Sequence, residues 1–150
     1  MTNQKGQSMF EVVIAILIIA MVIIGIVSLS TFSLSNSLYT RNKTLAGKYS
    51  QEALEWLRSE REKDTTVFFN RAVTPSTFCL QDLVWTNTGN CASDEYVLNS
   101  STHKREVILT PTVMSGKRIM EVIVTTSWSD SKGLHQTKSS TNFNDIRENE

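Results

Sequence analysis

The chain has 150 residues, which is enough for one globular domain, and its 15 basic and 15 acidic residues give a formal net charge of zero at pH 7. This balance gives no support for binding to nucleic acid, because such binding usually needs a basic surface. Apolar residues make up 40% of the chain, but they are concentrated between Val12 and Val27, where every residue is apolar or glycine. The remainder is rich in Ser, Thr and Asn, so the sequence predicts one part in lipid and another in water.

The chain begins with a short polar segment. Met1 to Gly6 carries a single charged side chain, that of Lys5, and the apolar run follows soon after it. A secretory signal peptide would end its apolar core in a small-residue cleavage site such as Ala-x-Ala. The run instead passes into Ser28 to Phe32 without this pattern. The apolar segment is therefore predicted to stay attached to the mature chain.

Residues 9–29 are long and apolar enough for one transmembrane helix, since a span needs about 20 predominantly apolar residues. Glu11 is the exception in this segment. An ionisable side chain inside the bilayer costs roughly 3 kcal/mol unless it is paired or lies near the interface. Glu11 therefore indicates a function, and a position at the headgroup boundary is the alternative.

The helical pattern continues past the predicted membrane segment, and no Pro occurs before Pro75. Apolar positions recur at steps of seven, four, four and three residues, at Leu38, Leu45, Tyr49, Ala53 and Trp56. One helix is predicted over residues 7–62, about 80 Å long if unbroken, with its second half outside the membrane. Gly25 and the Ser-rich segment 28–37 are weaker helix formers, where bending is easiest.

Residues 63–150 are predicted to form an extracytoplasmic β-domain. Residues 64–102 have no sustained period and indicate an irregular connection with short elements. Alternation then predicts a strand over 106–113, with Val107, Leu109 and Val113 on one side, and Pro111 makes it an edge or bulged strand.

The clearest strand alternates strictly, with Met120, Val122, Val124, Thr126 and Trp128 on one face. A turn at residues 130–133 places Gly133 where a positive φ is favoured, and residues 134–143 are predicted to return as the antiparallel partner. A sheet of three or four strands is expected.

Cys79 and Cys91 flank a polar, turn-rich stretch of a length that a disulfide can close. Outside the cytoplasm such a bond is expected to form and to stabilise the fold by about 2–4 kcal/mol. Two buried free thiols are the alternative. A metal site is disfavoured because two Cys and two distant His make no recognised ligand spacing, and no cofactor is predicted.

The two histidines, His103 and His135, have no Ser or Cys arranged in sequence to be activated, so we interpret them as surface or half-buried side chains rather than catalytic bases. Trp56 and Trp128 are expected in the core, whereas the role of Trp85 is left open. The sequence thus predicts no enzyme, since a stalked extracytoplasmic enzyme would need a cleft with convergent ionisable groups.

Lys5-Gly6 followed by Gln7-Ser8-Met9-Phe10-Glu11 and an unbroken apolar helix resembles the prepilin cleavage and methylation motif of type IV pilins and type II secretion pseudopilins. The resemblance implies that prepilin peptidase cuts after Gly6 and methylates the new amine of Gln7, with Lys5 as the leader charge. It further implies that the Glu11 carboxylate faces the terminal ammonium of a neighbouring subunit. Pairing of these two charges would lower the cost of both and fix the axial register between helices.

The resemblance also implies an α+β pilin-like fold, with a cleaved leader at residues 1–6, a long N-terminal helix and a small antiparallel sheet. Its expected partners are prepilin peptidase, other pilin or pseudopilin subunits, an inner-membrane assembly platform and the lipid bilayer. The expected location is a single pass through the cytoplasmic membrane, with the C-terminal domain outside the cytoplasm, followed by assembly into a pilus or pseudopilus.

Residues 51–58, Trp128-Ser129-Asp130 and Gly133-Leu134-His135 are most similar to the minor pilin V and pseudopilin I branch. Two departures accompany the resemblance: Gln7 stands where Phe is common, and no acidic calcium-binding loop precedes the C-terminus. The function expected is that of a minor filament subunit. The alternative is a membrane-anchored binding domain whose helix is only a tether, in which case Gly6 and Glu11 could be replaced without consequence.

Overall fold

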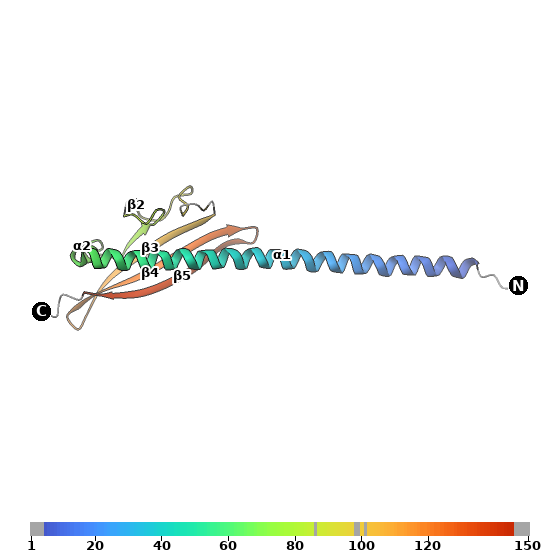
Figure 1. Ribbon diagram of the computed structural model, residues 1–150, viewed down its shortest axis with the longest axis horizontal. Coiled ribbons are helices and arrows are strands. Elements are labelled where there is room, and N and C mark those ends of the chain that lie inside the picture. The colour runs from blue at the N-terminus through green and yellow to red at the C-terminus, as the bar shows by residue number, and fades with distance from the viewer. Residues whose placement is uncertain (1–4, 86, 98–99, 101, 146–150) are drawn as a thin grey trace. The chain divides into compact units, whose positions relative to one another are not determined.

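The computed structural model describes residues 5–85, 87–97, 100 and 102–145, which form two helices and five strands (Figure 1). The elements in chain order are α1 Lys5–Lys63, α2 Thr65–Asn70, β1 Ser76–Cys79, β2 Asn87–Thr88, β3 His103–Met114, β4 Lys117–Asp130 and β5 Gly133–Asn144. The predicted α+β class is confirmed. The chain divides into two compact units between Arg41 and Asn42, so that α1 contributes to both.

α1 contains 59 residues and ends at Lys63, one residue after the expected end. It continues without a break through Gly25 and the Ser-rich segment, where bending was predicted to be easiest. Within that segment the Ser30 hydroxyl donates to the Ile26 carbonyl at 2.9 Å, and the Thr31 hydroxyl donates to the Val27 carbonyl at 3.0 Å. These polar side chains are therefore satisfied by the helix itself.

The part of α1 in the second unit buries one narrow stripe of mostly small residues. The fully buried positions are Ala46, Ser50, Ala53 and Leu57, which recur at steps of four, three and four residues. The expected stripe shares only Ala53 with this set, since the larger Leu45, Tyr49 and Trp56 are half-buried beside it. Small side chains at the centre let the helix approach the sheet closely, while larger ones fill the space on either side.

The five strands form one antiparallel sheet in the order β2-β1-β3-β4-β5. Three or four strands were expected, and the additional ones are the short β1 and β2, which lie in the segment predicted to be irregular. The predicted alternation of β4 is confirmed, because its five predicted core residues are all buried. Met120, Val122 and Val124 form one hydrophobic cluster with Val107, Leu109 and Phe143.

The strand predicted over 106–113 lies within β3, but two of its expected features differ. Val113 is 72% exposed rather than buried, because it lies beside the turn that joins β3 to β4, where Ser115 and Gly116 both have a positive φ. Pro111 causes no bulge in the pairing with β4. β1 pairs with β3 only as far as Ser76 opposite Leu109, so Pro111 lies beyond the end of β1, where no N–H is needed.

The predicted turn at residues 130–133 joins β4 to β5, and the return strand is antiparallel as expected. Gly133 has a φ of 119°, a conformation that side chains disfavour. The Asp130 carboxylate accepts a hydrogen bond from the Lys132 backbone N–H at 2.7 Å. This bond is a reason for Asp at the first position of the turn, and it lowers the pKa of Asp130.

Trp85, whose role was left open, is a packing residue. Its ring lies 4.8 Å from that of Trp56 and 5.3 Å from that of Phe78, measured between centroids. Its Nε1–H donates to the Glu60 carboxylate at 2.8 Å, and the Arg71 guanidinium lies over its face. The loop after β1 is thereby attached to the end of α1.

Candidate functional site

The N-terminal part of α1 exposes a continuous apolar surface within its own unit. Every side chain from Met9 to Leu34 is exposed, and the most apolar window has a mean hydropathy of 3.3 with none of it buried. This is one helix long and apolar enough to cross a membrane. The large side chains occur on all sides of the helix, as is typical of a segment that lipid or other apolar helices cover.

Glu11 interrupts this surface. It is the only acidic or basic residue between Met9 and Arg41, and its exposed side chain lies between those of Phe10 and Val12. An apolar environment around Glu11 removes water from its carboxylate, which then needs a positive or hydrogen-bonding partner, whereas at the headgroup boundary the carboxylate stays hydrated. The described residues place no such partner beside it in this chain.

The other predicted processing residues lie at the beginning of the same helix. Lys5, Gly6 and Gln7 form the first turn of α1, and residues 1–4 of the predicted leader lie outside the described residues. Gln7 is four residues before Glu11, which is one turn of the helix. The backbone at the predicted cleavage position is therefore helical in this state, although a peptidase must bind it extended.

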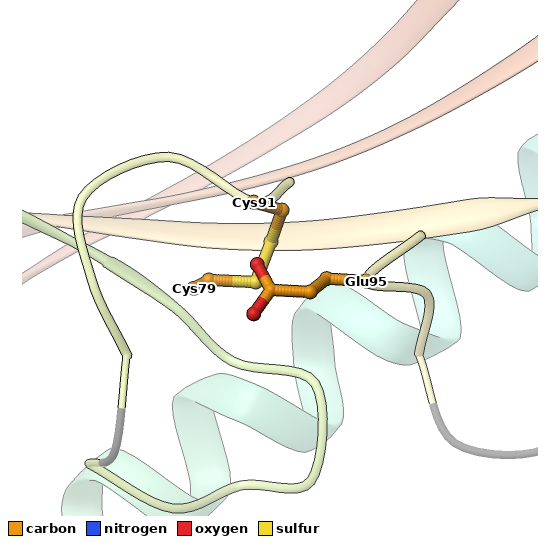
Figure 2. A group of neighbouring side chains, drawn as sticks. All are labelled: Cys79, Cys91 and Glu95. Carbon is orange, nitrogen blue, oxygen red and sulfur yellow. A yellow bond between two sulfur atoms is a disulfide. The ribbon is translucent and has the colours of Figure 1, made fainter. Parts of the chain in front are cut away.

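Cys79 and Cys91 form a disulfide with a Cα–Cα distance of 4.8 Å, as predicted, so the alternative of two free thiols is wrong. The bond closes the loop that carries Trp85 and β2. Figure 2 shows the Glu95 carboxylate beside the sulfur atoms, and it accepts a hydrogen bond from the Ala92 N–H at 2.7 Å. Because the sulfur atoms are bonded to each other, these three side chains are not a metal site in this state.

His103 is only 1% exposed, so the expectation of a surface or half-buried side chain is wrong for it. Its Nε2 lies 3.1 Å from the Asn42 carbonyl oxygen, and its Nδ1 lies 2.9 Å from the Thr102 hydroxyl and 3.1 Å from that of Ser100. A neutral ring that donates from Nε2 to the carbonyl and accepts hydroxyl hydrogen bonds at Nδ1 fits these contacts. Burial lowers the pKa of His103, which favours the neutral form.

The two histidines lie on opposite sides of Trp128. His103 and His135 both stack on its ring, with centroid distances of 5.9 and 5.4 Å. His135 is half-buried, as expected, and its Nε2 lies 2.9 Å from the Asp130 carboxylate. These contacts join α1, β3 and β5 through packing and hydrogen bonds, and this accounts for both side chains without a chemical step.

Arg105 is a buried cation that sequence reasoning missed. It is 2% exposed, and it donates to the Leu80 carbonyl at 3.0 Å, the Tyr49 carbonyl at 3.0 Å and the Glu52 carboxylate at 2.7 Å. Burial lowers the pKa of Arg105, and the neighbouring Glu52 opposes this effect. The guanidinium thus connects β3 to α1 and to the segment after β1. The strand was predicted only from residue 106, one residue after Arg105, although Arg105 is in phase with the inward-facing Val107 and Leu109.

One hollow of about 440 Å³ lies beside the beginning of β5. Its lining consists of Tyr96, Thr102, Lys104, Ser127, Trp128, Ser129 and Leu134. Lys104 is already engaged, because its ammonium donates to the Ala92 carbonyl and lies over the Tyr96 ring. Its described lining contains no carboxylate or histidine, and its two titratable side chains, Lys104 and Tyr96, pack against each other.

Comparison of the chain with protein-family models, with curated proteins and with solved structures finds no match. The layout itself, a long apolar N-terminal helix followed by a small antiparallel sheet, is consistent with a pilin-like architecture. The candidate site is accordingly the apolar surface from Met9 to Leu34, with Glu11 as its one charged group.

Proposed function

We propose that this chain is a minor structural subunit of a type IV pilus-like filament, processed by prepilin peptidase and assembled through its N-terminal helix. The observation that carries the proposal is the fully exposed apolar segment of α1 interrupted by one carboxylate, Glu11. A tether needs only the apolar segment. A packed bundle of such helices gives the carboxylate a role as well.

Processing is proposed to occur between Gly6 and Gln7. Gly is among the poorest helix formers, at about 1 kcal/mol less favourable than Ala, so the first turn of α1 opens at low cost at this position. Gly also presents no side chain to the peptidase. Cleavage followed by methylation would leave a charged secondary amine at the start of the apolar helix.

Assembly is proposed to pair this amine with Glu11 of a neighbouring subunit. Each charge alone in an apolar bundle costs roughly 3 kcal/mol, and pairing removes much of that cost. A slip of one helical turn would separate the charges by about 5 Å, so the pair selects one axial register. The surrounding Ile, Val and Leu side chains supply apolar contact without a preference for register.

The second unit, residues 42–150, is proposed to lie outside the membrane and on the outside of the filament. Its disulfide is consistent with an oxidising compartment. A minor subunit of this kind could prime assembly, and the inner-membrane platform and other pilin or pseudopilin subunits are the proposed partners. The choice among pilus, competence filament and secretion system depends on those partners.

The experiment that tests processing is the intact mass of the membrane-extracted protein, expressed with and without prepilin peptidase. We expect loss of residues 1–6 and gain of one methyl group, and we expect Gly6→Ala to abolish both. Gly25→Ala is the matched control, because a Cβ at Gly25 meets no atom within 4 Å and the site is far from the cleavage position. A chain that stays full length with active peptidase would favour the plain tether.

A further inference from the structure

The two edges of the sheet are β2, which has only 2 residues, and β5, and on the β2 side most of the outer backbone groups of β3 are already used. β1 pairs with β3 from Ser76 opposite Leu109 to Cys79 opposite Glu106. The chain beyond β1 adds two further bonds to this side of β3, since Leu80 N donates to the Arg105 carbonyl at 2.9 Å and Val97 N donates to the His103 carbonyl at 2.7 Å. Past the end of β1, Pro111 has no N–H to offer to another strand.

The opposite edge is β5, and no strand among the described residues pairs with its outer side. Its 12 residues pair with β4 in one unbroken register, from Ile119 opposite Asn144 to Asp130 opposite Gly133, so it has no bulge. It contains no Pro, and Lys138 is its only Lys, Arg, Asp or Glu. Long exposed edges are usually protected by Pro, bulges or several charges, and β5 has only its one lysine.

The direction of the β5 backbone groups follows from its pairing. Asp145 N donates to the Arg118 carbonyl at 3.0 Å, in continuation of the same register, so the odd-numbered residues of β5 face β4. The even-numbered residues therefore direct N–H and C=O outward, and all their side chains are exposed. They are Leu134, Gln136, Lys138, Ser140, Asn142 and Asn144. The outward N–H groups are not needed for the pairing of β5 with β4.

We propose that the outer edge of β5 is a docking site for an extended polypeptide strand of another protein, which adds to the sheet by backbone hydrogen bonds. The exposed side chains of β5 are mostly uncharged amides and hydroxyls, so the backbone supplies most of the attraction. Lys138, at the middle of the edge, selects the charge of the partner residue that lies opposite it. Like charges directly opposite each other are unfavourable, so the partner strand carries an acidic or uncharged residue at this position.

A second copy of this chain fits the edge less well than a different protein does. Antiparallel pairing of two β5 strands requires a two-fold axis normal to the sheet. With the two strands centred on each other, that axis places Lys138 of one copy opposite or diagonal to Lys138 of the other. Like charges at such positions are unfavourable. The proposal depends neither on membrane attachment nor on filament assembly.

The test is fluorescence anisotropy of a labelled peptide mixed with the full chain in detergent micelles. The peptide is as long as β5 and alternates Thr and Val, with one Glu at its centre and both ends blocked. We expect saturable binding. The control peptide has the same sequence with N-methyl groups on successive central residues, which remove donors from both of its edges, and it is expected to bind at least about ten-fold more weakly.

Variants of β5 test whether the labelled peptide binds at the outer edge of this strand. Ser140→Pro removes an outward N–H and is expected to weaken binding at least about ten-fold, whereas Ser140→Ala keeps that N–H and should bind as the native chain does. Tryptophan fluorescence during unfolding verifies that each variant remains folded. If Ser140→Pro unfolds, Lys138→Glu replaces it: this variant should bind the Glu peptide several-fold more weakly and recover binding when the peptide carries Lys instead.

Absence of saturable binding to the native chain overturns the proposal, and so does equal binding by a folded Ser140→Pro variant. Light scattering of the micelles identifies the competing occupant. A native chain that is dimeric, becomes monomeric on Ser140→Pro and releases the peptide on dimerisation would assign the edge to a second copy and overturn the assignment to a different protein.

Discussion

The two parts of α1 share one secondary structure but have opposite surfaces. Up to Arg41 almost all described side chains are exposed, although most are large and apolar. From Asn42 onward the helix buries a narrow stripe of mostly small residues and exposes charged ones such as Lys48 and Glu55. The described residues of the first unit provide no cover for the first part, whereas the second part has its cover in the sheet.

Because the two parts of α1 differ in this way, stability and assembly can be measured by substitutions in different parts of the helix. Substitutions in the second part of α1, or in the sheet beneath it, should change the free energy of unfolding. Substitutions in the first part should leave that quantity unchanged and should change association with lipid or other helices. Trp56, Trp85 and Trp128 all belong to the second unit, so tryptophan fluorescence measures unfolding of that unit alone.

The largest effect on stability is expected for Arg105→Met. The substitution removes the three hydrogen bonds of the buried guanidinium and leaves the Leu80 carbonyl without this donor. Hydrogen bonds to a charged group contribute roughly 1.5–3 kcal/mol each, so a loss of about 3–5 kcal/mol is expected. Denaturant unfolding followed by tryptophan fluorescence measures it. Lys104→Met is the matched control on the adjacent, outward position, with an expected change below about 1 kcal/mol. Equal small changes for both variants would contradict the assigned role of Arg105.

The next largest effect is expected for a substitution in the first part of α1, and it should leave the free energy of unfolding of the second unit unchanged. Glu11→Leu removes the carboxylate and leaves the amine of each neighbour unpaired, at roughly 3 kcal/mol, which corresponds to about a 100-fold loss of incorporation into filaments. Incorporation is measured by quantitative immunoblotting of sheared filaments. Met21→Leu is the control in the same apolar surface, with little change expected. Normal incorporation of Glu11→Leu would favour a tether.

Removal of the disulfide should have a smaller effect on stability than loss of Arg105. The double substitution Cys79→Ser and Cys91→Ser is expected to lower the free energy of unfolding by about 3 kcal/mol, because the bond restricts a short loop in the unfolded chain. Reduction of the native protein should produce the same loss, and the double variant should show no further loss on reduction. The free energy of unfolding is measured by denaturant titration of the oxidised and of the reduced protein, for the native chain and for the double variant.

Periodicity predicted the parts of this fold in which one residue pattern determines the structure. The helix from the apolar run to Lys63 and the alternation of β4 follow from such patterns, and both are observed. β1 and β2 contain 4 and 2 residues, too few for a period to be recognised, and they depend on pairing with distant segments. The exact buried stripe of α1 was missed because sequence periodicity favours the largest apolar residues, whereas close packing on the sheet selects small ones.

Buried polar residues were the least predictable part of the structure. Arg105 and His103 were not expected in the core. Each forms its hydrogen bond with a backbone carbonyl far away in sequence, Arg105 with that of Leu80 and His103 with that of Asn42. No local pattern marks such a partner. Glu11 was predictable for the opposite reason, since one charge within an apolar run is visible without any tertiary information.

The smallest effect is the pH dependence contributed by His103. Burial holds its pKa in the folded state below the ordinary value of about 6.5, so the unfolded chain binds the proton more readily. The stability that depends on the neutral His103 ring is therefore fully present above about pH 6.5 and is lost as the pH falls toward the lowered pKa of the folded state. The free energy of unfolding changes with a slope of at most about 1.4 kcal/mol per pH unit in this range. Below that folded pKa the loss from this residue reaches its limit.

His103→Gln should remove this slope, because the amide can still donate to the Asn42 carbonyl but cannot take up a proton. The free energy of unfolding is measured between pH 7 and pH 5 for the native chain, for His103→Gln and for His135→Gln. The last variant is the matched control, since it removes the other histidine that stacks on Trp128 and keeps His103. Loss of the slope in His135→Gln and its persistence in His103→Gln would assign the pH dependence to the half-buried ring instead of the buried one.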